Sequence, residues 1–171
     1  MIKKGNLLSE GKAKSLFETE KHEELMMVYR DDTSAFDGKK KEALKGKGEI
    51  NNIFNAHIMD YLANNGVETH YLKTVSENES LVQRLDMLPV ECVVRNIATG
   101  SICRRLGVKQ GLNFEEPLFE FFLKDDDLGD PLINDNHIIA FRWGTEKEID
   151  IMKEKTLAIN CLLYTSDAAD D

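Results

Sequence analysis

Cysteine is scarce in this chain, and long apolar runs are missing from it. The three cysteines, Cys92, Cys103 and Cys161, form no CxxC pair and have no histidine-rich neighbourhood, which argues against a disulfide framework and a zinc site. The longest apolar runs, such as Leu25–Tyr29, fall far short of a membrane span, and no apolar stretch follows the charged start as it would in a signal peptide. The sequence therefore predicts a cytoplasmic protein with reduced thiols and no membrane partner.

Positive charge is also in short supply. The chain has 22 lysines and arginines against 31 aspartates and glutamates, a formal net charge of −9. Because broad nucleic-acid binding relies on basic residues that neutralise phosphates, this balance argues against a nucleic-acid partner. A small anionic ligand stays compatible with it, since one local basic pocket suffices. A chain of 171 residues, 42% of them hydrophobic, is long enough to bury a core in one domain or two small lobes.

Short strand-like runs dominate the first half of the chain, and one helical stripe interrupts them. The helix is expected to be capped by Asn51 or Asn52, to carry His57 as a packed core residue and to end at Asn64–Gly66. Asp31–Gly38 predicts a turn, because its short polar side chains bond their own backbone. The expected strands are Leu7–Gly11, Lys14–Thr19, Glu24–Arg30, Val67–Thr74 and Ser80–Leu85.

Helices are more prominent in the second half. The strand Val90–Asn96 precedes a short helix at Ser101–Leu106, and further helices are expected from about Asn134 and over Glu146–Asn160. Strands and helices do not alternate as regular βαβ units, which argues against a Rossmann sheet. The pattern predicts an α+β protein with a β-rich lobe over residues 1–88 and the start of a mixed lobe over 89–160, divided near Asp86–Pro89.

The last eleven residues differ in character from what precedes them. Cys161–Asp171 reads CLLYTSDAADD, and the expected helix stops where this string begins. The string resembles translated sequencing-adapter DNA, and a genuine acidic terminus is the alternative. We therefore expect residues 161–171 to be a foreign tail and leave them out of the expected fold.

The segment Ser9–Lys14 (SEGKAK) is the first candidate for chemistry. Gly11 lets the backbone approach an anion, and in a strand Lys12 and Lys14 would share one face, where two ammonium groups match the charge of a triphosphate. A surface turn with solvated lysines is the alternative, and the short string alone favours it. A P-loop is not formed here, because GxxxxGK[ST] at a helix start is missing.

A second candidate combines an arginine with a serine at a helix start. Arg95 on its strand is costly to bury unpaired, so we expect it to meet an anion. Gly100 and Ser101 open the next helix, whose amino terminus favours phosphate. These residues predict a pocket for a phosphate monoester; the alternative is an arginine paired with an internal acid beside an ordinary helix cap.

Two acid-rich segments are weaker candidates. Asp31–Gly38, which includes Asp37, offers carboxylates and hydroxyls that suit a metal-bound phosphate or an amine nucleophile, and an Asx-rich turn explains it at least as well. Lys124–Pro131 contains four aspartates without the register of an EF-hand, so Asp125–Asp127 predict a solvated loop. Lys124 and Asp130 bracket that loop.

Five segments, in this order, resemble successive motifs of the SAICAR synthase family: SEGKAK, DDTSAFDG, LVQRLDMLPVECVVRN, ATGS and PLFEFFLKDDDLGDP. The resemblance covers about Leu7–Asn160. It implies a two-lobed α+β architecture similar to protein kinases, with ATP between the lobes. It also implies an ATP- and Mg²⁺-dependent ligase of purine biosynthesis, which joins L-aspartate to the carboxylate of CAIR, a carboxylated aminoimidazole ribonucleotide, to form SAICAR, ADP and phosphate. Family members are often oligomers, so a homo-oligomer is expected for a full-length protein.

The resemblance implies roles for individual residues. Those expected at the ATP phosphates are Gly11, Lys12, Ala13 and Lys14. Those expected at the adenine base are Val82 and the hinge residues Asp86 and Met87. Those expected to bind the nucleotide substrate are Arg95, Gly100 and Ser101. Those expected near the reacting groups are Lys12, Asp37, Lys124 and Asp130.

The family continues beyond the motifs found here, with DxKxEFG-like and DExSPDxxRxW-like segments that supply metal-binding carboxylates. We therefore expect a chain truncated at its C-terminus, without metal ligands of its own and without turnover of CAIR as written. Two other interpretations stay open: an ATP-dependent small-molecule kinase of similar fold, and a non-catalytic nucleotide-binding module.

Overall fold

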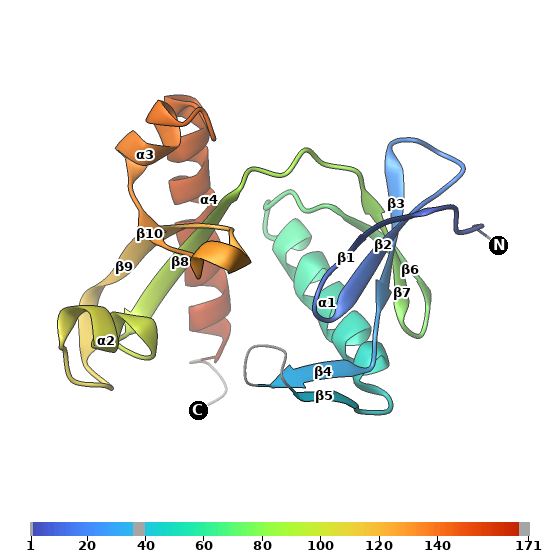
Figure 1. The fold of residues 1–171 in the computed structure, drawn as a ribbon, viewed down its shortest axis with the longest axis horizontal. Helices are drawn as coiled ribbons and strands as arrows, with labels where there is room; N and C mark the ends of the chain where they lie inside the picture. The colour runs from blue at the N-terminus through green and yellow to red at the C-terminus, as the bar shows by residue number, and fades with distance from the viewer. Residues whose placement is uncertain (1, 36–39, 168–171) are drawn as a thin grey trace. The chain divides into compact units, whose positions relative to one another are not determined.

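The chain forms two compact units, Met1–Asp86 and Met87–Asp171, in a computed structural model that describes residues 2–35 and 40–167 (Figure 1). Each unit combines an antiparallel sheet with helices, which confirms the predicted α+β class. The expected division near Asp86–Pro89 includes the point where the two units meet in the sequence. Within the described residues, no helix is both long and apolar enough to span a bilayer.

A five-stranded antiparallel sheet forms the basis of the first unit. In sheet order its strands are β1 (Leu7–Glu10), β2 (Lys14–Glu18), β3 (Glu24–Tyr29), β7 (Glu79–Gln83) and β6 (Tyr71–Ser76). The central strand β3 is apolar and largely buried, as expected for a strand covered on both faces. Leu25, Met27 and Tyr29 of this strand pack with Val82 of β7 to form a core cluster.

Helix α1 (Lys47–Asn64) packs on this sheet against β3, β6 and β7 (Figure 1). It begins before the predicted cap residues, so that prediction was wrong. Asn52 lies inside the helix with no exposed surface, and its amide donates to the carbonyls of Ser76 (3.0 Å) and Glu77 (3.1 Å). Its oxygen accepts from the hydroxyl of Ser80 (2.5 Å). Local helix signals suggested a cap, whereas the side chain ties α1 to the β6–β7 turn.

A remote carboxylate holds the start of α1. Asp31 accepts hydrogen bonds from the backbone N–H groups of Gly46 (3.3 Å) and Gly48 (2.9 Å). Helix α1 also approaches β3 closely, since a Cβ added at Gly48 would lie only 2.5 Å from the carbonyl oxygen of Tyr29. His57, predicted to be a core residue, is exposed, and Leu62 at 4% exposure packs inward instead.

The segment predicted as a turn after β3 begins as a strand. β4 (Asp32–Ala35) pairs antiparallel with β5 (Lys40–Ala43), which belongs to the lysine-rich stretch of the sequence. Backbone pairing with this strand overrides the local turn propensity of β4. The prediction of a turn starting at Asp31 was therefore wrong. Asp37 lies outside the described residues.

The second unit is built on a three-stranded antiparallel sheet. Its strands, in sheet order, are β10 (Leu132–Ile133), β9 (Asn113–Leu123) and β8 (Val90–Ile97). Helix α4 (Glu146–Asp167) packs against β8 and β9 (Figure 1), and Phe121, Ile138 and Ile149 form the core between sheet and helices. Helix α4 runs past Asn160, where the sequence predicted its end, and includes residues 161–167 of the expected tail.

Short helices complete the second unit. Helix α2 (Ser101–Leu106) ends, as predicted, at Gly107, which adopts a positive φ of 66°. Helix α3 (Asp135–Ala140) begins at the predicted Asn134, whose side chain accepts from the N–H of His137 (3.1 Å). The 3₁₀ turn η1 (Asp126–Leu128) lies in the acidic loop after β9.

Candidate functional site

The turn between β1 and β2 carries the predicted ATP-phosphate residues. Gly11 donates from its N–H to the carbonyl of Lys14 (2.8 Å) and accepts from the guanidinium of Arg30 (2.7 Å). Arg30 also donates to the hydroxyl of Ser15 (2.9 Å) and pairs with Glu10 (2.8 Å). This arginine, which sequence reasoning missed, therefore anchors the turn from the end of β3.

The four predicted residues of the turn are not equivalent. Ala13 and Lys14 line a pocket of about 320 Å³ next to the turn, whereas Gly11 and Lys12 do not. Lys12 lies in the turn and Lys14 is the first residue of β2, so strand alternation does not place their side chains on one face. Among the described residues, the pocket is lined by Ala13, Lys14, Tyr29, Asn51, Phe54, Asn55 and Ile58.

The electrostatics of this pocket are set by one ammonium group and a buried phenol. The Lys14 Nζ lies 6.0 Å from the ring centroid of Tyr29. Burial, with a smaller contribution from Tyr71, raises the pKa of Tyr29 to about 12, so its hydroxyl stays protonated at neutral pH. Burial and then the charge of Lys14 lower the pKa of His70, which favours a neutral imidazole.

The second predicted pair, Arg95 and Ser101, is brought together in the second unit. The Arg95 guanidinium donates to the Ser101 hydroxyl (3.1 Å) and pairs with Glu120 of β9 (2.7 Å). Arg105 donates to the same hydroxyl (3.1 Å) and forms an ion pair with the same carboxylate. Two guanidinium groups thus meet one carboxylate, which leaves positive charge in excess beside the hydroxyl.

Sequence reasoning missed Arg105 and Glu120 in this cluster. The strand register explains why Glu120 pairs with Arg95. Glu120 lies opposite Val93 in the β8–β9 ladder and is therefore on the same face of the sheet as Arg95. A single acid inside the apolar run of β9 was the available signal. The internal acid anticipated as an alternative is therefore present, although the expected helix cap is not: Gly100 is the N-cap, with no side-chain hydrogen bond.

The bracketing residues of the acidic loop play different parts. Lys124 is exposed, and its N–H donates to the carbonyl of Pro89 (3.0 Å). Asp130 adopts a positive φ of 48° and accepts from the N–H of Asp125 (2.9 Å), so its carboxylate closes the loop on itself. Within residues 2–35 and 40–167, no three His, Cys, Asp or Glu side chains gather as a metal site would require.

The predicted adenine contacts are distributed between a core and a surface. Val82 is only 2% exposed and packs in the core of the first unit. Asp86 is exposed and Met87 is 77% exposed, at the ends of the two units. None of these three residues belongs to the described lining of the pocket beside Lys14.

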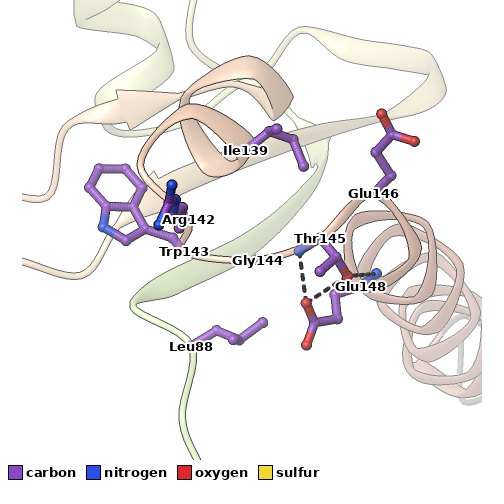
Figure 2. A pocket seen from close by; sticks show the side chains of 8 residues that line it. All are labelled: Leu88, Ile139, Arg142, Trp143, Gly144, Thr145, Glu146 and Glu148. Atoms are coloured by element: carbon purple, nitrogen blue, oxygen red, sulfur yellow. Dashed lines mark hydrogen bonds between the residues drawn. The ribbon is translucent and has the colours of Figure 1, made fainter.

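A larger pocket, of about 600 Å³, lies in the second unit where Leu88 faces the segment before α4. Figure 2 shows two of its lining residues bound to each other: Thr145 donates from its N–H and its hydroxyl to Glu148, both at 2.7 Å. Both hydrogen bonds lower the pKa of Glu148, and the bond from the hydroxyl has the larger effect. None of the predicted site residues lines this pocket, which is formed by Leu88, Ile139, Arg142, Trp143, Gly144, Thr145, Glu146 and Glu148.

Comparisons with known proteins agree on one family. The family model described as SAICAR synthetase matches residues 7–169. The phosphoribosylaminoimidazole-succinocarboxamide synthase of Alcanivorax borkumensis is 58% identical over 162 residues, which cover 95% of this chain and 68% of the relative. The enzyme of the same name from Nitrosococcus oceani is 56% identical, with 94% of this chain and 68% of the relative covered.

Solved structures give the same result at lower identity. The synthase of that name from Ehrlichia chaffeensis superposes with a TM-score of 0.88 at 34% identity, covering 92% of this chain and 67% of that one. A SAICAR synthetase solved in complex with ADP superposes with a TM-score of 0.89 at 35% identity, covering 96% and 69%.

Proposed function

This chain belongs to the SAICAR synthetase family, and we propose that it carries phosphate-binding and substrate-binding parts of an ATP-dependent ligase that joins L-aspartate to the carboxylate of CAIR. The observation that carries the proposal is the convergence of Arg95 and Arg105 on the hydroxyl of Ser101. Such a cluster suits the phosphate of a nucleotide substrate. Use of ATP is supported by the family member solved with ADP.

The proposed chemistry explains why a nucleotide triphosphate is needed. A carboxylate is a poor electrophile, because substitution on it would expel oxide. Transfer of the γ-phosphoryl group to a carboxylate oxygen breaks the bond between that phosphorus and the β–γ bridging oxygen and releases ADP. The amine of L-aspartate then attacks the acyl carbon, phosphate leaves, and the nitrogen loses a proton to give the amide. Phosphoryl transfer depends mainly on positioning and charge neutralisation.

In the first unit, we assign the ATP phosphates to the turn formed by Gly11, Lys12, Ala13 and Lys14. The fold itself does not demand a glycine at position 11, since an added Cβ would meet only the Lys14 carbonyl, at an ordinary 3.7 Å. The presence of glycine at position 11 is therefore better explained by a ligand that approaches the backbone. Val82, Asp86 and Met87 remain the residues proposed for adenine.

In the second unit, we assign the nucleotide substrate to Arg95, Gly100 and Ser101. Helix α2 has only six residues, so the guanidinium groups rather than its amino terminus supply the positive charge. Lys12, Asp37, Lys124 and Asp130 stay proposed for the neighbourhood of the reacting groups. Mg²⁺ is the proposed second cofactor and would supply further charge neutralisation, although the described residues offer no complete set of ligands for it.

A chimera tests the proposed reaction. Residues 1–160 of this chain would replace the corresponding part of the Alcanivorax borkumensis synthase, whose remaining segment completes the protein. We expect ADP release that requires both CAIR and L-aspartate. Replacing Arg95 with Lys in the chimera should raise the KM for CAIR about 10-fold or more, because lysine cannot bind an oxyanion through two parallel donors.

The matched control is Arg104→Lys, which changes an exposed neighbour on α2. ADP release with CAIR alone, at the same rate with and without L-aspartate, would support a small-molecule kinase and contradict the ligase. A folded chimera that releases no ADP would contradict both.

Two further properties are proposed on the same basis. A cytoplasmic location fits the biosynthetic role of the relatives. The homo-oligomer expected from the family stays a prediction, and sedimentation velocity of the chimera checks it.

A further inference from the structure

The pocket beside Lys14 contains two buried hydrogen-bond donors that lack partners. The hydroxyl of Tyr29 and the amide nitrogen of Asn55 are both shielded from solvent, and neither has a hydrogen-bond partner among the residues the structure describes. Both side chains line the pocket, and Tyr29 is only 4% exposed. Buried polar groups are nearly always paired, and an unmade hydrogen bond costs on the order of 1–3 kcal/mol. Two such groups in one pocket call for a ligand.

The chemistry of the lining indicates the charge of that ligand. Lys14 contributes an ammonium group, and none of the seven lining residues in the described part of the chain is acidic. Phe54 and Ile58 add apolar side chains to the lining. One positive charge, a phenol donor and an amide donor without a competing carboxylate are suited to an acceptor with negative charge.

We propose that Tyr29 and Asn55 donate hydrogen bonds to an oxyanion, either a phosphoryl group or a carboxylate, that binds beside Lys14. The inference rests on the proposed function, which supplies both sources: the phosphates of ATP and the carboxylates of L-aspartate. It extends the anion site from the Gly11–Lys14 turn to the end of β3 and one face of α1.

Neighbouring contacts hold the strand and the helix that carry these donors in place before a ligand arrives. The backbone N–H of Tyr29 donates to the carbonyl of Asn78 (2.8 Å), and the Asn78 amide donates back to the Tyr29 carbonyl (2.9 Å). The contact at Gly48 fixes α1, and with it Asn55, against the same strand. Donors fixed in this way lose little entropy when an anion binds.

The phenol predicts an unusual pair of effects. Tyr29→Phe removes a hydroxyl that has no hydrogen-bond partner among the residues the structure describes, so the free variant should melt at the same temperature or higher. The same change should weaken anion binding about 10-fold, because a hydrogen bond to a charged group is lost. A hydroxyl with a purely structural role would instead lower the melting temperature and leave binding unchanged.

Isothermal titration of the 171-residue chain with ATP, L-aspartate and inorganic phosphate, at fixed ionic strength, tests the site. Asn55→Asp keeps the shape of the side chain but places negative charge beside the anion, and we expect a loss of about 100-fold in affinity. Tyr71→Phe is the matched control, because the Tyr71 hydroxyl bonds Thr74 (2.9 Å) and does not line the pocket. Its affinities should equal those of the unmodified chain.

The titrations separate the two sources and the two proposals. If the two variants lose affinity only for ATP and phosphate, the pocket is a phosphoryl site. If they lose affinity only for L-aspartate, it is a carboxylate site. Unchanged affinities in both Tyr29→Phe and Asn55→Asp, with ATP still bound, would overturn this inference and leave the proposed function standing. Failure of the unmodified chain to bind any of the three probes would overturn this inference, and failure of the chimera to use ATP would separately overturn the proposed function.

Discussion

The anion-facing clusters of the two units differ in how far the fold already satisfies them. In the second unit, Arg95 and Arg105 are both paired with Glu120, so the groups offered to a phosphate also hold β8, β9 and α2 together. In the first unit, Tyr29 and Asn55 each keep a donor that has no partner in the described part of the chain. Binding should therefore be separable from stability in the first unit and coupled to it in the second.

Removing the shared carboxylate should give the largest effect. The side chain of Glu120 is only 9% exposed, and Glu120→Ala leaves two guanidinium groups without their partner. Breaking a buried pair on one side is strongly destabilising, so we expect a loss of about 3 kcal/mol in the free energy of unfolding, measured by urea denaturation. Phosphate should restore part of this loss, since it replaces the missing negative charge.

Glu116→Ala, an exposed change on the same strand, is the control and should stay within about 0.5 kcal/mol of the unmodified chain. Equal stabilities of Glu120→Ala and Glu116→Ala would show that Arg95 and Arg105 are already solvated. Binding and stability would then not be coupled in the second unit, and the two units would not differ in this respect.

Alkaline pH should destabilise the first unit through Tyr29. Its pKa is raised to about 12, above the ordinary value of 10, so the native state resists ionisation that the unfolded chain accepts. The stabilising contribution is complete below pH 10 and is lost as the pH rises to 12, by about 2 kcal/mol. Urea titrations of the unmodified chain and of Tyr29→Phe, compared at each pH, separate the contribution of this phenol to stability from that of the lysines, which also titrate at alkaline pH. Parallel curves from pH 9 to 12 would contradict the burial of the hydroxyl.

Moving α1 away from β3 should reduce stability and binding together. In Gly48→Ala the new Cβ meets the Tyr29 carbonyl oxygen at 2.5 Å, so helix and strand must separate, at a cost of about 1–2 kcal/mol. That separation widens the gap between Tyr29 and Asn55, and ATP affinity should fall as well. Gly11→Ala, whose Cβ has room, is the comparison: it should keep the melting temperature and lose affinity only. A Gly48→Ala variant of unchanged stability would contradict the close packing.

The fold was predictable where local pattern and tertiary pairing agree. Strand β8 and helix α2 lie where periodicity and Gly107 placed them. The prediction failed where a distant partner decides the structure. Asp32–Ala35 becomes a strand because β5 pairs with it, and Asn52 is buried because carbonyls of the β6–β7 turn take its hydrogen bonds. No local signal reveals such partners.

The candidate site shows the same division. The motif containing Arg95 and Ser101 predicted two side chains that do meet. Glu120 and Arg105 were missed because their roles depend on strand register and on the turn of a short helix. Tyr29 and Asn55 were missed for a different reason: Tyr29 belongs to an apolar strand and Asn55 to the predicted helix, so neither stands out as a binding residue. Only coordinates show that a polar atom of each lacks a hydrogen-bond partner among the described residues.

The smallest effect should be a change in the titration of His70, which reports on charge beside Lys14. Burial and the ammonium group of Lys14 both lower the pKa of this imidazole. An oxyanion bound beside Lys14 offsets the effect of the ammonium charge but leaves the effect of burial. The pKa of His70 should therefore rise on addition of ATP or L-aspartate and still stay below its ordinary value. Proton NMR of the imidazole across pH 4 to 8 measures the change. Lys14→Met is the control, because it removes the charge and should raise the pKa of His70 without any ligand. If a bound anion left the titration of His70 unmoved in the unmodified chain, the anion would be binding away from Lys14, and the pocket in the first unit would not be its site.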